Sequence, residues 1–285
     1  MIFLAASIVS STAIYVIFKW AGGFSCRLKT LIAVNYLTAA ILGFGFFLRF
    51  NPAPFFNNNQ WIPFAIALGI LYIAMFFLIG ASSQKAGVTV TTLANKLSLV
   101  FPVFFSLYWF NEPVSVWKIT GLITAVAAVL LTLYKKNIRR TNFLWFILPL
   151  AIFVGSGFTD SFIKFIQGTR ITGEQTAAFS TFVFFVSFVC GSVLVAFPGK
   201  EDRKIAHIPT LLLGILLGMA NFGSLYFIIS ALNLSQLDSS LVFALNNMLI
   251  VALSASAGFF IFKEKMNRIN IAGLILAFIS LYILL

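Results

Sequence analysis

Residues 110–121 read FNEPVSVWKITG and residues 262–273 read FKEKMNRINIAG, and each stretch leads into an apolar segment. The two stretches lie 152 positions apart and share a Phe, a Glu and a Gly at matching places. The same offset carries Asn95 onto Asn247, and an offset of 145 positions carries Ser11, Tyr15 and Lys19 onto Ser156, Asp160 and Lys164. The chain therefore contains two copies of one unit, and duplicated units with a site between them are a common plan of secondary transporters.

The composition indicates an integral membrane protein. Hydrophobic residues fill 61% of the 285 positions, charged residues fill 9%, and the mean hydropathy is +1.04. A soluble domain needs a larger polar surface than this composition provides. Lys and Arg outnumber Asp and Glu by 19 to 7. They lie mainly in short connections such as Lys200 to Lys204, where they fix topology and meet lipid headgroups, so nucleic acid is not an expected partner.

About 20 apolar residues cross a bilayer as a helix. The charged, Pro, Gly and Asn clusters divide the chain into ten segments of this kind: Ile2 to Trp20, Leu31 to Leu48, Trp61 to Ser82, Val88 to Phe110, Val116 to Tyr134, Phe143 to Phe165, Gln175 to Phe197, Ile208 to Leu232, Ser239 to Phe262 and Ile269 to Leu285. Asn51 to Gln60 reads as a loop, and Lys135 to Asn142 as the linker between the two copies.

The predicted fold is an all-α membrane protein with ten transmembrane helices in one membrane domain. Residues 1–137 form the first five-helix repeat and residues 138–285 form the second. Because five is an odd number, the second repeat enters the membrane from the opposite side, which makes the repeats inverted. The positive-inside rule places both termini outside. Gly214 and Gly218 form a G-x-x-x-G motif, which is typical of close helix packing.

Lys96 is the first candidate binding residue. It lies mid-way along the fourth predicted span beside Asn95, and a charge there costs on the order of 3 kcal/mol unless it is paired or solvated. Its function is either to bind a substrate anion or coupling ion in a cavity, or to form a structural ion pair. Pro102, in the same span, predicts a kink that widens the space beside Lys96.

Asp160 is the natural partner of Lys96, because it is the one acidic residue well inside a predicted span. Ser156, Asp160 and Lys164 recur every four residues and share one helix face, as do Ser11, Tyr15 and Lys19. Both faces are expected to point into the bundle. An intrahelical pair of Asp160 with Lys164 is the alternative reading.

Four asparagines complete the set of candidates. Asn246 and Asn247 lie mid-way along the ninth span, and Asn247 matches Asn95 at the 152-residue offset. Their amides either line a polar cavity or hold neighbouring helices together. Asn221 in the eighth span is a further candidate for substrate binding.

The sequence does not indicate an enzyme. It contains no Gly-rich phosphate loop, no H-E-x-x-H motif and a single histidine, His207, at a span boundary. Cys26 and Cys190 have no ligand or redox spacing, so neither a metal nor a cofactor is expected.

The string YFIISAL at residues 226–232, the ninth span ending in Phe262-Lys263-Glu264, and the following Ile271-Ala272-Gly273 resemble the drug/metabolite transporter superfamily, specifically its ten-helix EamA-like permeases. The first half resembles the family at Phe76 to Ala81 and at Asn111-Glu112-Pro113. The resemblance implies two inverted repeats, a central cavity, alternating access and export or exchange of small polar metabolites. It also implies that Glu112 and Glu264 orient helix ends.

Within that family, the phosphate-handling members resemble this chain in a Lys on the fourth helix, but Asn247 and Met248 stand where they have basic residues on the ninth. One cavity cation fits a carboxylate or a zwitterion better than an organic phosphate. The predicted function is thus a secondary transporter in the bacterial inner membrane, and the resemblance allows a coupling proton or a counter-substrate. The alternative is a channel or assembly scaffold on the same repeats.

Overall fold

The computed structural model describes residues 2–49, 59–109, 115–134, 143–171, 175–196, 207–234 and 239–283. Within these ranges every regular element is helical. The elements are α1 (Ile2–Gly23), α2 (Leu28–Leu42), the π-helical turn η1 (Gly43–Phe47), the 3₁₀ turn η2 (Asn59–Trp61), α4 (Ile62–Lys85), α5 (Val88–Leu97), α6 (Val100–Trp109), α7 (Val116–Leu133), α8 (Phe143–Thr169), α9 (Thr176–Ala196), α10 (Ile208–Leu234), α11 (Ser239–Phe260) and α12 (Arg268–Ile283).

The helices follow the predicted segments closely, and they confirm an all-α chain over the described ranges. Helices α4 and α8 extend a few residues past the predicted ends, to Lys85 and Thr169, because the polar residues there are compatible with a helix. Six segments of the described chain are long and apolar enough to cross a membrane: Ile2–Gly23, Leu28–Phe47, Ile62–Lys85, Trp145–Ile166, Thr176–Ala196 and Ile208–Ala231.

The fourth predicted segment is not one continuous helix. It consists of α5 and α6, which are separated by Ser98 and Leu99. Pro102 lies four residues after Ser98 and has no N–H to donate to the Ser98 carbonyl. That carbonyl instead accepts a hydrogen bond from the backbone N–H of Phe101 at 2.9 Å. The predicted kink is therefore present as a break one turn before the proline.

Several predicted features lie outside the described residues. They are most of the Asn51 to Gln60 loop, the linker with the boundary between residues 137 and 138, the Lys200 to Lys204 cluster, and Asn111-Glu112-Pro113.

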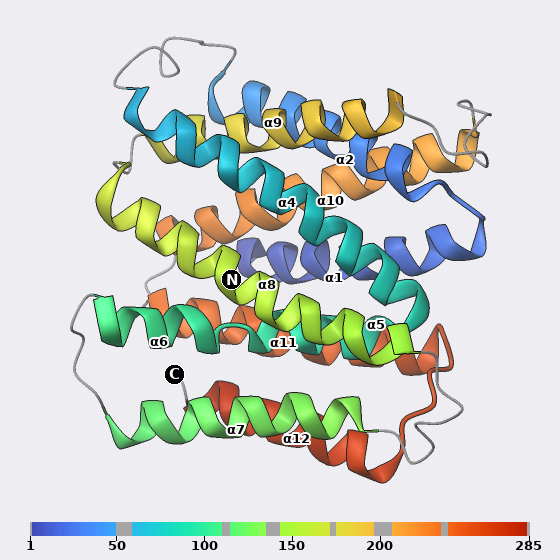
Figure 1. Cartoon of the computed structure of the whole chain (residues 1–285), viewed down its shortest axis with the longest axis vertical. Helices are drawn as coiled ribbons and strands as arrows, with labels where there is room; N and C mark the ends of the chain where they lie inside the picture. Colours follow the sequence, from blue (N-terminus) through green and yellow to red (C-terminus); the bar gives the residue numbers. More distant parts are fainter. Residues whose placement is uncertain are drawn as a thin grey trace.

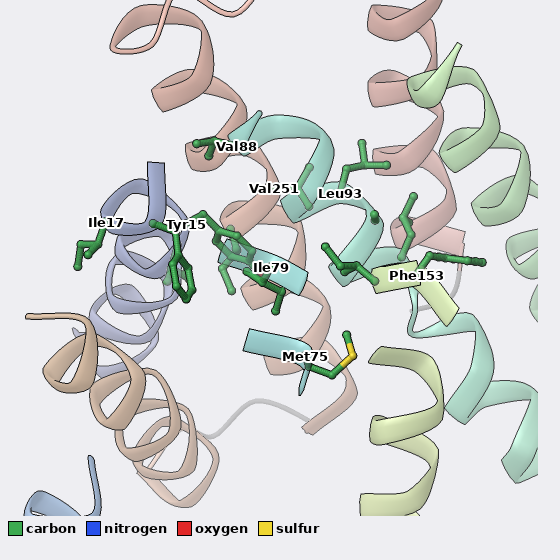
Figure 2. Packing of buried hydrophobic residues seen from close by; sticks show 14 of the residues in the cluster. Tyr15, Ile17, Met75, Ile79, Val88, Leu93, Phe153 and Val251 are labelled. Atoms are coloured by element: carbon green, nitrogen blue, oxygen red, sulfur yellow. The ribbon is translucent and has the colours of Figure 1, made fainter. Parts of the chain in front are cut away.

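The helices form a bundle in which partners come from both halves of the chain (Figure 1). Helix α2 packs against α9 at one extreme of the long axis, and α7 packs against α12 at the other. Between these pairs, α1 packs against α10 and α4 against α8, while α5 packs against α11. Because the two halves are interleaved, they share one large buried cluster, part of which is shown in Figure 2.

The interface of α10 with α2 depends on two small residues, as the G-x-x-x-G motif predicted. A Cβ at Gly218 would come within 2.6 Å of the backbone oxygen of Asn35, and one at Gly214 within 3.1 Å of the backbone oxygen of Leu31. These contacts leave no room for a side chain, so the two backbones approach each other closely.

We expect Gly218→Ala to destabilise the protein by about 1–3 kcal/mol, because the added methyl group overpacks a backbone contact. Gly23→Ala is the matched control, since a Cβ there meets nothing within 4 Å. Thermal unfolding of the two purified variants tests this expectation. Equal melting temperatures for the two variants would contradict it.

Candidate functional site

A cavity of about 470 Å³ lies in the interior of the bundle, between helices of both halves, and we call it the central cavity. Its wall includes all seven residues that the sequence singled out for binding: Tyr15, Asn95, Lys96, Asp160, Asn221, Asn246 and Asn247. These residues come from α1, α5, α8, α10 and α11, so the fold brings together side chains that are far apart in the sequence.

Helix α5 supplies Asn95 and Lys96 directly before the break at Ser98 and Leu99. Both side chains are half-buried. The Nδ2 of Asn95 donates a hydrogen bond to the Ser156 hydroxyl on α8 at 3.0 Å. This bond fixes the turn of α5 that carries Lys96 against α8.

Helix α8 supplies the acidic group. The hydroxyl of Ser98 is shared between the backbone oxygen of Asn95 at 2.5 Å and, more weakly, Oδ2 of Asp160 at 3.4 Å. The Asp160 side chain is exposed to the open space of the cavity. Lys96 and Asp160 line the same cavity from helices that pack against each other. The wall of the central cavity therefore carries one cationic and one anionic side chain on neighbouring helices.

In each of the two predicted polar stripes, the first two residues face the interior of the bundle. Ser11 and Tyr15 on α1 and Ser156 and Asp160 on α8 all line the central cavity. Lys19, the third residue of the α1 stripe, lines a separate cavity at the end of that helix.

The asparagines differ in their surroundings. The amides of Asn221 and Asn35 meet at 3.3 Å between α10 and α2, so Asn221 joins helices as well as lining the cavity. Asn246 is buried, and its Oδ1 has no hydrogen-bond partner within the described part of the chain. Asn247 is half-buried at the cavity wall.

The sequence did not predict the aromatic part of the central cavity wall. Tyr72 and Phe76 on α4 and Phe184 on α9 line the central cavity. A tyrosine in the middle of an apolar span was a usable signal for Tyr72. Phe184 had no such signal, because it is one of 35 phenylalanines.

These groups suit a small molecule with charged ends and an organic body. A cation and an anion can each bind an opposite charge, amides supply donors and acceptors, and aromatic faces pack against carbon. Among the described residues, no group of three or more His, Cys, Asp or Glu side chains is placed to hold a metal ion.

The first half of the chain matches a known protein family. Residues 1–134 match the EamA-like transporter family. The predicted resemblance to the drug/metabolite transporter superfamily is thereby confirmed. Together with the apolar helices, this match to an EamA-like transporter family supports a multi-pass integral membrane protein. It also supports the prediction that the chain is not an enzyme.

Two other proteins are similar to this chain over almost its whole length. An uncharacterized protein of Haemophilus influenzae is 27% identical over 99% of this chain and 96% of its own length. A protein of known crystal structure aligns with a TM-score of 0.64 at 12% identity, covering 99% of this chain and 94% of the other. At 12% identity, the second comparison shows similarity of the fold alone.

We expect a cysteine at position 247 to react with a small water-soluble thiol reagent, because Asn247 lines a cavity whose wall also carries charged and amide side chains that water can solvate. The variant is made in a background in which Cys26 and Cys190 are replaced by serine. Ser187→Cys is the matched control, since Ser187 is fully buried and its hydroxyl donates to the Gly69 carbonyl oxygen at 2.9 Å. Labelling of Asn247→Cys should be at least about ten-fold faster, as judged by mass spectrometry. Equal rates would mean that the cavity is closed to water.

Proposed function

We propose that this protein is a secondary transporter that exports or exchanges a small polar metabolite through the central cavity by alternating access. The substrate carries a carboxylate or is a zwitterion. The observation that supports this most strongly is the presence of Lys96, Asp160 and four asparagines on one cavity wall inside an apolar bundle. Buried ionisable groups in a membrane protein are costly, and they usually mark a substrate or ion pathway.

The proposed architecture has ten membrane-crossing helices in two inverted repeats, residues 1–137 and 138–285. The packing of the helices supports it. If α1, α2, α4, α5 with α6, and α7 correspond to α8, α9, α10, α11 and α12, the largest contacts between the two halves exchange in pairs. The contact of α1 with α10 corresponds to that of α8 with α4, and the contact of α2 with α10 corresponds to that of α9 with α4.

We further propose that the membrane is the bacterial inner membrane and that both termini are outside. The end of the bundle where α4 ends and α5 begins then faces the cytoplasm. That end carries most of the basic residues in the described connections: Arg27, Lys29, Lys85, Lys263, Lys265 and Arg268. The opposite end carries Arg49, Lys118 and Arg170, so the positive-inside rule supports this orientation.

We assign the two charges to the two ends of a zwitterion. Lys96 binds the carboxylate and Asp160 binds the ammonium, while Asn95, Asn246 and Asn247 supply further hydrogen bonds. Tyr15 and Asn221 complete the wall around the bound molecule. A monocarboxylate would use Lys96 alone.

Lys96→Ala should abolish transport, and Lys96→Arg should retain part of it. A charge-assisted hydrogen bond contributes about 1.5 to 3 kcal/mol, which corresponds to about ten- to a hundred-fold in affinity. Arginine keeps the charge but is longer and planar. The measurement is counterflow of radiolabelled L-amino acids and monocarboxylates in proteoliposomes at matched protein levels. Lys85→Ala, at an exposed position outside the cavity, is the control.

Two other outcomes have different meanings. If Lys96 carries a proton, Lys96→Arg should be as inactive as Lys96→Ala, because arginine does not release its proton in proteins. Wild-type transport by Lys96→Ala would show that the substrate site lies elsewhere. Solute flux without counterflow would favour a channel.

Asp160→Asn should separate the two substrate classes. Loss of the carboxylate removes the partner of an ammonium group, so zwitterion transport should fall by about ten-fold or more. Monocarboxylate transport should persist, because Lys96 remains in place. Equal losses for both classes would argue that Asp160 only positions Lys96.

A further inference from the structure

The polar face of α5 continues beyond the central cavity toward the start of the helix. Lys96 lines the cavity, Thr92 lies one turn before it, and Thr89 lies about one turn before Thr92. Both threonines are buried, and neither hydroxyl has a hydrogen-bond partner among the described residues. Threonine in a helix commonly bonds to a carbonyl one turn earlier, as Thr91 does to Gly87, so the lack of a partner is notable.

The same continuation is found on α4 and α11. On α4, Phe76 and Ile79 line the central cavity, and Ser83 is the next residue on that face. On α11, Ser254 follows Asn247 after seven residues, which returns it to the same face. Both serines are fully buried, and their hydroxyls likewise have no partner within the described ranges.

We call these four hydroxyl residues the seam: Ser83, Thr89, Thr92 and Ser254. Helix α5 packs against both α4 and α11, so it lies beside each of the other two helices that carry the seam. The turns of α5 and α11 that carry it also hold buried apolar residues, among them Val88, Leu93 and Val251 (Figure 2). Unpaired hydroxyls in such surroundings are unfavourable and need an explanation.

A second cavity lies beyond the seam. It has a volume of about 590 Å³ and lies where α1, α4 and α11 end, and we call it the end cavity. Its wall includes Lys19, Gln84 and Phe262. Lys19 is one turn past Tyr15, and Gln84 directly follows Ser83. The Nζ of Lys19 donates to the backbone oxygen of Gln84 at 3.2 Å. Helices α1 and α4 thus line both cavities, and Ile261 and Phe262, directly after α11, also line the end cavity. On α4, Ser83 lies between Ile79 of the central cavity and Gln84 of the end cavity.

Glu264 ties the start of α5 to the end of α11. The backbone N–H of Val88 donates to Oε1 at 2.6 Å, and that of Thr89 donates to Oε2 at 3.2 Å. A carboxylate at this place is stabilised by the unpaired N–H groups and the dipole of the helix. The resemblance predicted that Glu264 orients a helix end. In the structure this is the start of α5, which belongs to the other half of the chain.

Two glycines make room for this carboxylate. A Cβ at Gly87 would lie 2.6 Å from Oε1, and one at Gly258 would lie 2.5 Å from Oε2. Gly87 also has a φ of +108°, which disfavours other residues. Because the backbone on both sides is shaped around Glu264, the contact is specific.

We propose that the seam is the closed half of the substrate path between the central cavity and the end cavity, and that Glu264 is the latch that keeps it closed. The inference rests on the proposed transport function. Hydroxyls without partners in the closed path gain them from water or substrate when α5 separates from α11. The bonds to Glu264 join backbone N–H groups to a carboxylate at the bundle end, where water can replace them.

The competing reading is a static helix cap, and thiol labelling separates the two. The reporter is Thr92→Cys in the background without Cys26 and Cys190, in proteoliposomes, with a positively charged thiol reagent present on both sides. With Glu264 intact, labelling should be slow. With Glu264→Gln, which removes the charge at almost unchanged size, it should be at least about ten-fold faster. A static cap predicts an unchanged rate.

General loosening is tested with Ser187→Cys, whose side chain is buried against α4 near Gly69. Its rate should not change with Glu264→Gln, and a parallel increase would overturn the latch. Should Glu264→Gln fail to fold, Glu264→Asp keeps the charge and shortens the side chain, which withdraws the carboxylate from the Val88 and Thr89 N–H groups. It should accelerate labelling at position 92, and an unchanged rate would overturn the latch.

No substrate is present in this experiment, so its failure can be told from failure of the proposed function. Unchanged labelling in a protein that transports overturns the latch alone. Labelling that depends on Glu264 in a protein without counterflow activity overturns the transporter proposal and leaves a gated polar path.

Discussion

The free energy of placing a charge inside a membrane is the constraint on which this bundle depends. On insertion scales a lysine at the centre of a bilayer costs on the order of 3 kcal/mol. Lys96 avoids exposure to lipid because it lines an interior cavity, in whose wall Asp160 and several amides also lie. The apolar residues of the chain can then cover the outside, where side chains such as Ile123 and Phe185 are exposed.

The hydrogen bonds around the cavity hold α5 at two points. Near the middle of the bundle, Asn95 bonds to Ser156 on α8, and Ser98 bonds to Asp160 on the same helix. At the end of the bundle, Glu264 binds the first N–H groups of α5. The break before α6 makes α5 a short helix, so the rest of the fourth segment does not have to move with it. A short rigid element with polar attachments at both ends is well suited to adopt two positions.

Much of this could be predicted from the sequence, for physical reasons. The repeated Phe, Glu and Gly positions and the apolar run lengths predicted the helices, and the cost of intramembrane polar groups identified seven residues of the cavity wall. The lining by Tyr72 and Phe184 could not be predicted, because an aromatic residue in a Phe-rich span is equally compatible with lipid or core. The contact of Glu264 with α5 could not be predicted from the sequence either. It joins residues 176 positions apart, and helical periodicity relates only near neighbours in the sequence.

The position of the seam is explained by the periodicity of the helices. A helix that lines a cavity presents every third or fourth residue to it, and the same face continues past the cavity in both directions. If the continuation served only to pack helices, apolar residues would be the more stable choice, because an unpaired buried hydroxyl costs about 1–3 kcal/mol. Hydroxyls are useful there only if the face is wet in another state of the protein. Thr92 lies one turn from Lys96, so a movement of α5 that wets Thr92 also changes the surroundings of the cationic group. Opening of the path and release of a bound carboxylate would then be one event, which is the coupling that alternating access requires.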